Sequence, residues 1–89
     1  MKRLGLGVII GTYVGYSLFR GSGSKSAKKG LLLVHFSTQN GLATLLVEKV
    51  YYNKVIKDLP PEMVVAVTYE EMSTGDDKIY ILNTVREIV

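Results

Sequence analysis

The first part of the chain alternates between apolar residues and glycine. The large apolar side chains of this stretch stand at Leu4, Leu6, Val8, Ile10, Val14, Tyr16 and Leu18. Four of the seven intervening positions are glycine, so a strand here would have one face with little to pack. On a helix, Gly7, Gly11 and Gly15 would align at i, i+4 and i+8 and let a second helix approach closely in lipid. The pattern therefore favours a glycine-zipper helix.

The same stretch has the polarity expected of a membrane span. Residues 4–19 hold no charged side chain over sixteen positions, and Lys2, Arg3 and Arg20 flank them. A helix of this length extends for about 24 Å, and the flanking basic side chains can reach the headgroups of a somewhat thicker bilayer. We expect residues 1–20 to form a transmembrane anchor helix. The alternatives are a buried strand, a core helix and a cleaved signal peptide, although Arg20 stands where a cleavage motif would begin.

Residues 21–30, GSGSKSAKKG, have the composition of a flexible, basic linker, natural or engineered. We expect Arg20, Lys25, Lys28 and Lys29 to contact anionic headgroups, with a solvated linker as the alternative. The slight excess of basic residues on this flank places the domain that follows in the cytoplasm.

The second part of the chain reads as a small folded domain. The apolar run at residues 31–36 predicts a buried strand, and residues 63–71 and 78–88 predict a hairpin around the turn sequence STGDD. Residues 42–59 predict a helix that ends before Pro60, although residues 47–57 suit a strand equally well. The predicted fold is α+β, with a single N-terminal transmembrane helix followed by a β-α-β-β domain over residues 31–89.

The net charge of +3 hides an asymmetry between the two parts. Residues 1–29 hold six basic and no acidic side chains, whereas residues 30–89 hold five basic and eight acidic ones. A nucleic-acid surface needs clustered Lys and Arg, so we expect no nucleic acid as a partner. The chain has no cysteine, which excludes disulfides and thiolate chemistry.

Two short stretches invite a catalytic or metal-binding interpretation. His35 and Ser37 would share one face of a strand, but no orienting acid or oxyanion site accompanies them. Asp76 and Asp77 follow Gly75 in the predicted hairpin loop, where such residues are ordinary turn formers. We expect a structural histidine and no metal ion, cofactor or small-molecule substrate.

Two further features admit a binding role. Tyr51 and Tyr52 stand beside Lys49 and Lys54, a combination that could stack bases but equally describes core tyrosines with exposed lysines. Residues 87–89 could add as a strand to a partner, or could simply end a sheet.

These observations predict a single-pass membrane protein that carries no catalytic activity and recruits or regulates a membrane-bound protein partner. Its Gly7/Gly11/Gly15 face would mediate self-association or pairing with that partner. The alternatives are a small accessory subunit of a larger membrane assembly, of channel, lysis or secretion type, and a fully soluble β-rich oligomeric protein.

Overall fold

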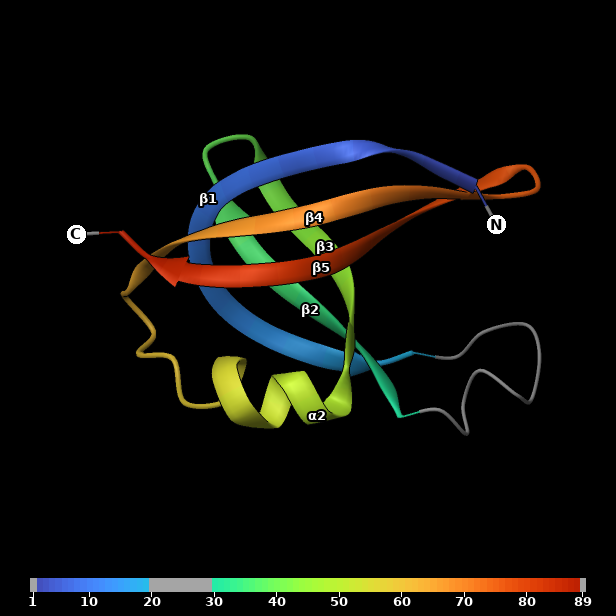
Figure 1. Cartoon of the computed structure of the whole chain (residues 1–89). Helices are drawn as coiled ribbons and strands as arrows, with labels where there is room; N and C mark the ends of the chain where they lie inside the picture. The colour runs from blue at the N-terminus through green and yellow to red at the C-terminus, as the bar shows by residue number, and fades with distance from the viewer. Residues whose placement is uncertain (1, 20–29, 89) are drawn as a thin grey trace.

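Five strands make up most of the molecule. The computed structural model describes residues 2–19 and 30–88, and Figure 1 shows their arrangement. The elements are β1 (Lys2–Leu18), β2 (Leu31–Thr38), β3 (Gly41–Glu48), α2 (Lys49–Tyr51), η1 (Tyr52–Ile56), β4 (Val64–Thr74) and β5 (Asp77–Glu87). The helical segments α2 and η1 follow one another directly and lie at one end of the strands.

The strands close into a barrel in the order β1-β2-β3-β5-β4, with β4 pairing back onto β1. Neighbouring strands are antiparallel except β3 and β5, which share a single parallel pair, Leu46 with Ile81. The helical segment connects β3 to β4. A closed barrel of five strands in this order resembles the OB fold, a five-stranded Greek-key barrel.

The prediction of an α+β protein with an N-terminal transmembrane helix is wrong, because the segment in question is the longest strand of the barrel. No helix in residues 2–19 and 30–88 combines the length and the apolar character that crossing a bilayer requires. The predicted single-pass membrane location, with the domain in the cytoplasm, is overturned by the same finding.

The glycines that suggested a helix instead allow β1 to pack as a strand. A Cβ atom at Gly7 would collide with the ring of Tyr69 on β4, and a Cβ atom at Gly11 would collide with the backbone carbonyl of Ser37 on β2. Gly15 has a φ of 152°, which favours glycine, beside an irregularity in the pairing of β1 with β2. The face that seemed to have little to pack is therefore occupied by neighbouring residues at Gly7 and Gly11, whereas a Cβ atom at Gly5 or Gly15 would have nothing within 4 Å.

The core lies between β2, β3, β4, β5 and the helical segment. Ten apolar residues are buried: Leu32, Val34, Phe36, Leu45, Val47, Tyr52, Ile56, Val65, Val67 and Leu82. None of them belongs to β1, which contributes the partly buried Ile9 and Tyr13. Full burial of a side chain such as Phe36 contributes about 1.5–3 kcal/mol to folding. The hydrophobic stabilisation of the barrel thus comes mainly from the other strands.

The strands expected at residues 31–36, 63–71 and 78–88 are present as β2, β4 and β5. The helix expected from residue 42 starts only at Lys49, because residues 41–48 pair with β2 along their whole length. Pairing with a neighbouring strand has outweighed the helix propensity of this leucine-rich segment.

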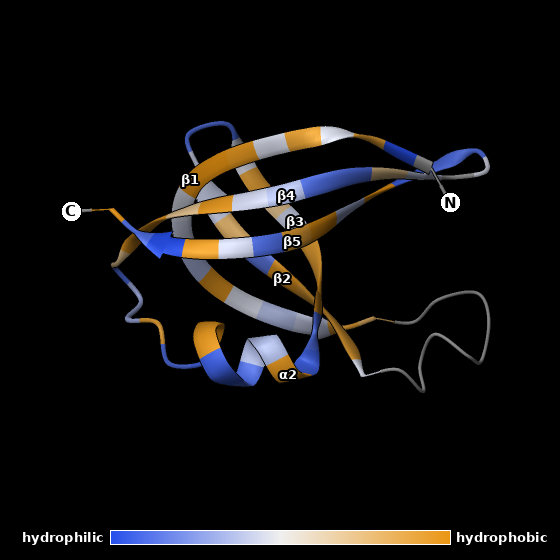
Figure 2. Cartoon of the chain, viewed as in Figure 1, coloured by the Kyte–Doolittle hydropathy of each residue, from blue (hydrophilic) through white to orange (hydrophobic). Residues whose placement is uncertain are grey.

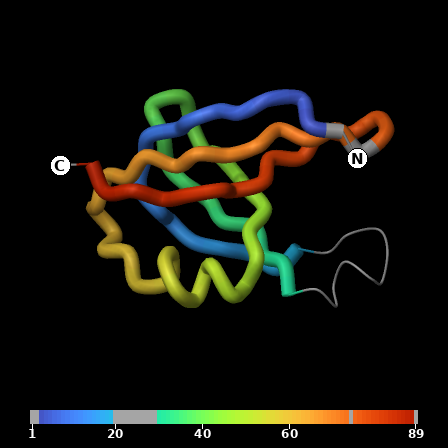
Figure 3. The backbone as a smooth tube through the Cα atoms, viewed as in Figure 1, coloured from blue at the N-terminus to red at the C-terminus, as the bar shows by residue number. Residues whose placement is uncertain are grey.

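β1 changes partners along its length. Residues 2–12 pair with β4, and residues 11–18 pair with β2. Figures 1 and 3 show the strand bending around the barrel, with its first half beside β4, and with β5 on the other side of β4. We call this part of the three strands, formed by residues 2–10, 66–74 and 77–86, the arm.

Candidate interaction surface

A row of large apolar side chains runs along the solvent-facing side of β1. The members of this outer row are Leu4, Leu6, Val8 and Ile10, in the first half of the strand, and between 44% and 65% of each is exposed. Figure 2 shows that hydrophobic positions dominate the first half of β1, whereas the outer halves of β4 and β5 carry more hydrophilic ones. Small proteins rarely expose a contiguous apolar surface of this kind unless it is used for binding.

The row is exposed because the strand's other face is already occupied. Glycine alternates with the row on the inward side, so β1 can lie close to Tyr69 and to β2 while its large side chains point outward. Across β4 the row continues with Ala66 opposite Ile10, and with Val64, which is also exposed, opposite Thr12. The apolar surface therefore extends onto β4 near the barrel, whereas Thr68 and Glu70 lie opposite Val8 and Leu6 farther along the arm.

The first half of β1 also has an edge without a ladder partner. On the side away from β4, no described residue pairs with residues 3–10. In such a strand every second residue points its N–H and C=O groups away from the existing neighbour. Protein edges are commonly protected by charged residues, proline or bulges. Here Arg3 is the only charged residue from 3 to 10, and the pairing of β1 with β4 is irregular between Arg3 and Gly5, so the regular part of this edge runs from Gly5 to Ile10.

A hollow of about 330 Å³ lies where this edge meets the barrel. Val8, Ile9 and Ile10 line it from β1, and residues 38–40 line it from the turn between β2 and β3. The hollow lies where the pairing of β2 with β1 ends, at Thr38 and Gly11. It leaves room for additional chain beside the edge.

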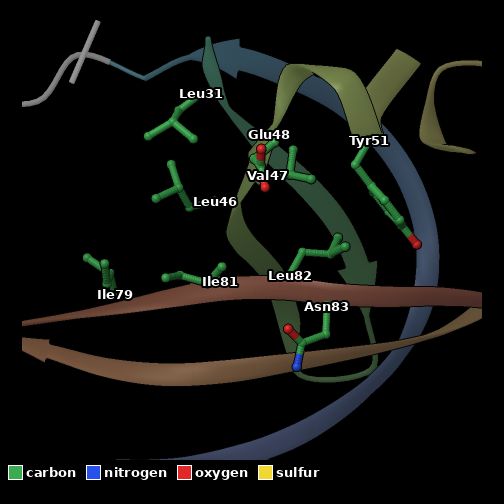
Figure 4. A pocket seen from close by; sticks show the side chains of 9 residues that line it. All are labelled: Leu31, Leu46, Val47, Glu48, Tyr51, Ile79, Ile81, Leu82 and Asn83. Carbon is green, nitrogen blue, oxygen red and sulfur yellow. The ribbon is translucent and has the colours of Figure 1, made fainter. Parts of the chain in front are cut away.

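A second apolar surface follows the seam between β3 and β5, where the barrel has only one ladder pair. A cavity of about 570 Å³ opens there, shown in Figure 4, with aliphatic side chains from β2, β3 and β5 and Tyr51 from α2 around it. Its polar members are Glu48 and Asn83. Leu31, Leu46 and Ile81 are only partly exposed, so covering them would bury less apolar surface than covering the outer row.

His35 joins three strands through its ring nitrogens. Its Nε2 lies 3.0 Å from Ser17 Oγ on β1, and its Nδ1 lies 2.8 Å from Thr44 Oγ1 on β3. The arrangement resembles a nucleophile and base, but a neutral hydroxyl occupies the position where a carboxylate would stabilise an imidazolium. Sequence reasoning paired His35 with Ser37, whereas the structure pairs it with Ser17. These two hydrogen bonds, from His35 to Ser17 and to Thr44, support a structural role for His35.

Three tyrosines connect the second half of β1 to the helical segment. The hydroxyls of Tyr13 and Tyr52 lie 2.9 Å apart, and the rings of Tyr13 and Tyr16 lie 6.2 Å and 5.1 Å from the ring of Tyr52. Burial, followed by the hydrogen bond and the nearby hydroxyls, raises the pKa of Tyr13 well above its usual range. Tyr52 is a core residue, and Tyr51 accepts a hydrogen bond from the Val85 N–H at 3.1 Å. Both residues of the suggested stacking pair are thus held within the fold.

The face that binds oligonucleotides in OB folds has little nucleic-acid character in this chain. That face is formed by the second and third strands. The residues that alternate with the buried positions of β2 and β3 are Leu31, Leu33, His35, Ser37, Leu42, Thr44, Leu46 and Glu48. They include no Lys or Arg for phosphates and no Phe, Tyr or Trp for stacking. The expectation of no nucleic-acid partner remains a prediction, and this composition supports it.

The remaining predicted residues are placed as follows. Asp76 and Asp77 lie exposed at the β4–β5 turn, and no cluster of three metal-binding side chains occurs among the described residues. Arg20, Lys25, Lys28 and Lys29, expected to contact headgroups, fall outside the described residues, and so does Val89. Gly7, Gly11 and Gly15, expected to pack helices, lie on β1.

Sequence reasoning recognised the alternating apolar positions of β1 but did not assign them an interaction surface. The apolar residues stand at every second position, which is typical of a strand, but the glycines between them favoured the interpretation as a helix. What could not be found locally is the free edge, because it depends on where β2 stops pairing with β1.

No family model, no curated protein and no solved structure matches the chain. The likeness to OB folds therefore stands on the closed five-stranded barrel and its strand order. It describes architecture, and function has to be argued from the surface itself.

Proposed function

We propose that the chain is a self-associating protein-interaction module without catalytic activity, and that a second copy of the chain covers the outer row of β1. The observation that carries the proposal is the exposure of this row, which reaches 65% at Leu6 and 62% at Val8. The proposal places association on the outer row and not on the Gly7/Gly11/Gly15 face, in which Gly7 and Gly11 are directed toward neighbouring strands.

The composition of the row suits contact with another copy. Between Leu4 and Ile10 no side chain of β1 is charged, and Glu70, which lies opposite Leu6 on β4, is 4.0 Å from Arg3, so two rows can meet without burying an unpaired charge. Covering a half-exposed aliphatic side chain contributes on the order of 1 kcal/mol, about half the value for full burial. Several such contributions are needed to offset the cost of association, and the row supplies them on one continuous strand.

Sedimentation velocity tests the proposal. Wild-type protein is measured from about 1 to about 100 μM, the range in which a modest interface dissociates. The test variant is Val8→Glu, and the control is Val50→Glu. Val50 is 64% exposed on α2, so the same substitution is made at the same exposure but away from β1.

We expect the wild type and Val50→Glu to form the same oligomer, and Val8→Glu to sediment as a monomer with unchanged circular dichroism. The reason is that burying a glutamate in the interface costs more than the lost valine contact. A wild type that stays monomeric throughout, or a Val8→Glu variant that still associates like the control, would overturn the proposal.

A further inference from the structure

The free edge of β1 has a sequence that is complementary to itself. We propose that two copies of the chain join by antiparallel pairing of these edges, with a two-fold axis at Gly7. The inference rests on the proposed function and names the mode of association. A partner copy then contributes one more strand to the arm of each molecule.

The uncharged stretch fixes the register. It runs from residue 4 to residue 10 along the edge, and its midpoint is Gly7. Antiparallel pairing about Gly7 sets Leu6 opposite Val8, and Leu4 opposite Ile10, with each pair occurring twice. Residues directly opposite in a ladder share a face of the sheet, so every aliphatic residue of the arm's outer row meets another aliphatic residue.

A neighbouring register is less suitable. An axis at Leu6 would set Lys2 opposite Ile10 and Arg3 opposite Ile9, and would bring a basic side chain against an aliphatic one at both ends. With the axis at Gly7, the paired segment ends with Leu4 opposite Ile10, because Gly11 is already paired with Thr38 on this side, and Arg3 lies beyond it. The two Arg3 residues then lie about 27 Å apart along the strands, at about 3.4 Å per residue.

The structure around the edge can accept this strand. Gly7 has no side chain at the axis, and Tyr69 already covers its inward side. The hollow of about 330 Å³ beside Val8, Ile9 and Ile10 lies where residues 4–6 of the second copy would run. The edge pairing and the hollow are separate observations, and both assign the same segment to the contact.

The result is a continuous sheet of six strands in the order β5-β4-β1-β1-β4-β5. It satisfies the N–H and C=O groups that the edge leaves without a ladder partner among the described residues. It also brings the two outer rows side by side, so they cover one another in part.

The absence of cysteine allows a direct test by disulfide mapping of the full chain. Leu6→Cys and Val8→Cys are prepared separately, one carrying an affinity tag, and are oxidised alone and as an equal mixture. Both positions are exposed, so the variants should fold, and circular dichroism checks this. Leu18→Cys is the control, because it is 62% exposed on the same strand but lies where β1 pairs with β2.

We expect the mixture to give covalent heterodimer in excess of either homodimer by on the order of tenfold. Directly opposite Cβ atoms lie about 4.5–5.5 Å apart, whereas two Leu6 positions would lie on a diagonal at about 7–8 Å, too far for a disulfide. Leu18→Cys should cross-link only at the rate of random collision.

The outcomes separate the two proposals. A wild type that forms dimers in sedimentation while the mixture shows no excess of heterodimer would overturn the register and leave the proposed function standing. A wild type that remains monomeric would overturn both. An excess of heterodimer together with collision-level cross-linking of Leu18→Cys would support the edge-paired dimer.

Discussion

The two halves of β1 carry a similar alternation of apolar residue and glycine, but they differ in what surrounds them. Residues 11–18 pair with β2, and their aromatic side chains contact the helical segment through Tyr52. Residues 2–10 pair with β4 on one side and have no described ladder partner on the other. The second half therefore closes the barrel, and the first half carries the free edge and the exposed row that we propose to bind a second copy.

The difference shows that the alternation itself does not decide what a strand does. Glycine on the inward face serves both halves, by admitting Tyr69 at Gly7 and the backbone of β2 at Gly11. In the second half, rings fill the space beside the strand, and the Ser17–His35 contact adds a polar link to β2. We therefore expect substitutions in the second half to affect folding and substitutions on the outer row of the first half to affect association.

The largest effect on folding is expected at Gly11. Gly11→Ala should lower the free energy of unfolding by about 2–3 kcal/mol, because the added methyl group meets the backbone carbonyl of Ser37, which cannot rotate away. Gly5→Ala is the matched control, since a Cβ atom there has nothing within 4 Å and removing a strand glycine is neutral or slightly stabilising. Urea denaturation with comparison of midpoints checks both. Equal losses in the two variants would show that close approach at Gly11 is not what shapes the strand.

The same glycines explain how far sequence reasoning could reach. The apolar runs of β2, β4 and β5 and the turn between β4 and β5 follow from local patterns, and they were predicted. β1 was misassigned because its glycine face has no local partner: Tyr69 lies 62 positions after Gly7 in the chain. β3 was misassigned because its leucine-rich sequence suits a helix, and only pairing with β2 makes it a strand.

The candidate surface was harder to predict than the fold. The residues of the outer row stand at alternate positions in the sequence, so their common face could be recognised. Their exposure could not, because it depends on β1 having its glycines inward and no strand or helix packed over its outer side. The free edge likewise follows from the point at which pairing passes from β4 to β2, near Gly11.

A smaller effect is expected at the tyrosine contact of the second half. Tyr13→Phe should cost about 1 kcal/mol at neutral pH, since it removes the hydrogen bond to Tyr52. Above pH about 10 the unfolded chain loses the Tyr13 proton while the folded protein still holds it, because folding raises the pKa of this hydroxyl. The stability contributed by this group is complete below that pH and declines as pH rises.

Urea unfolding at several pH values from neutral to alkaline checks this prediction. The stability of the wild type should fall more steeply with alkaline pH than that of Tyr13→Phe, so the difference between them should shrink. The double variant Tyr13→Phe/Tyr52→Phe should lose less than the sum of the two single losses, because both single variants break the same bond. If the stabilities of the wild type and of Tyr13→Phe fell in parallel as pH rises, the prediction that folding raises the pKa of Tyr13 would be contradicted.

The smallest effect is expected at Ser17, and it tests whether the hydrogen-bonded side chains of Ser17, His35 and Thr44 have a structural role. Ser17→Ala should cost about 0.5 kcal/mol, the lower range for a hydrogen bond, because the contact to His35 is exposed. Ser37→Ala is the control: it lies one strand away and is exposed, and its hydroxyl makes no hydrogen bond within the described part of the chain. Thermal unfolding distinguishes a small loss of stability in Ser17→Ala from no loss in Ser37→Ala.

Neither variant should change the sedimentation of the protein, because both residues lie outside the free edge. A Ser17→Ala variant that folded normally but lost self-association would place the interface on the second half of β1 and reverse the roles assigned to the two halves.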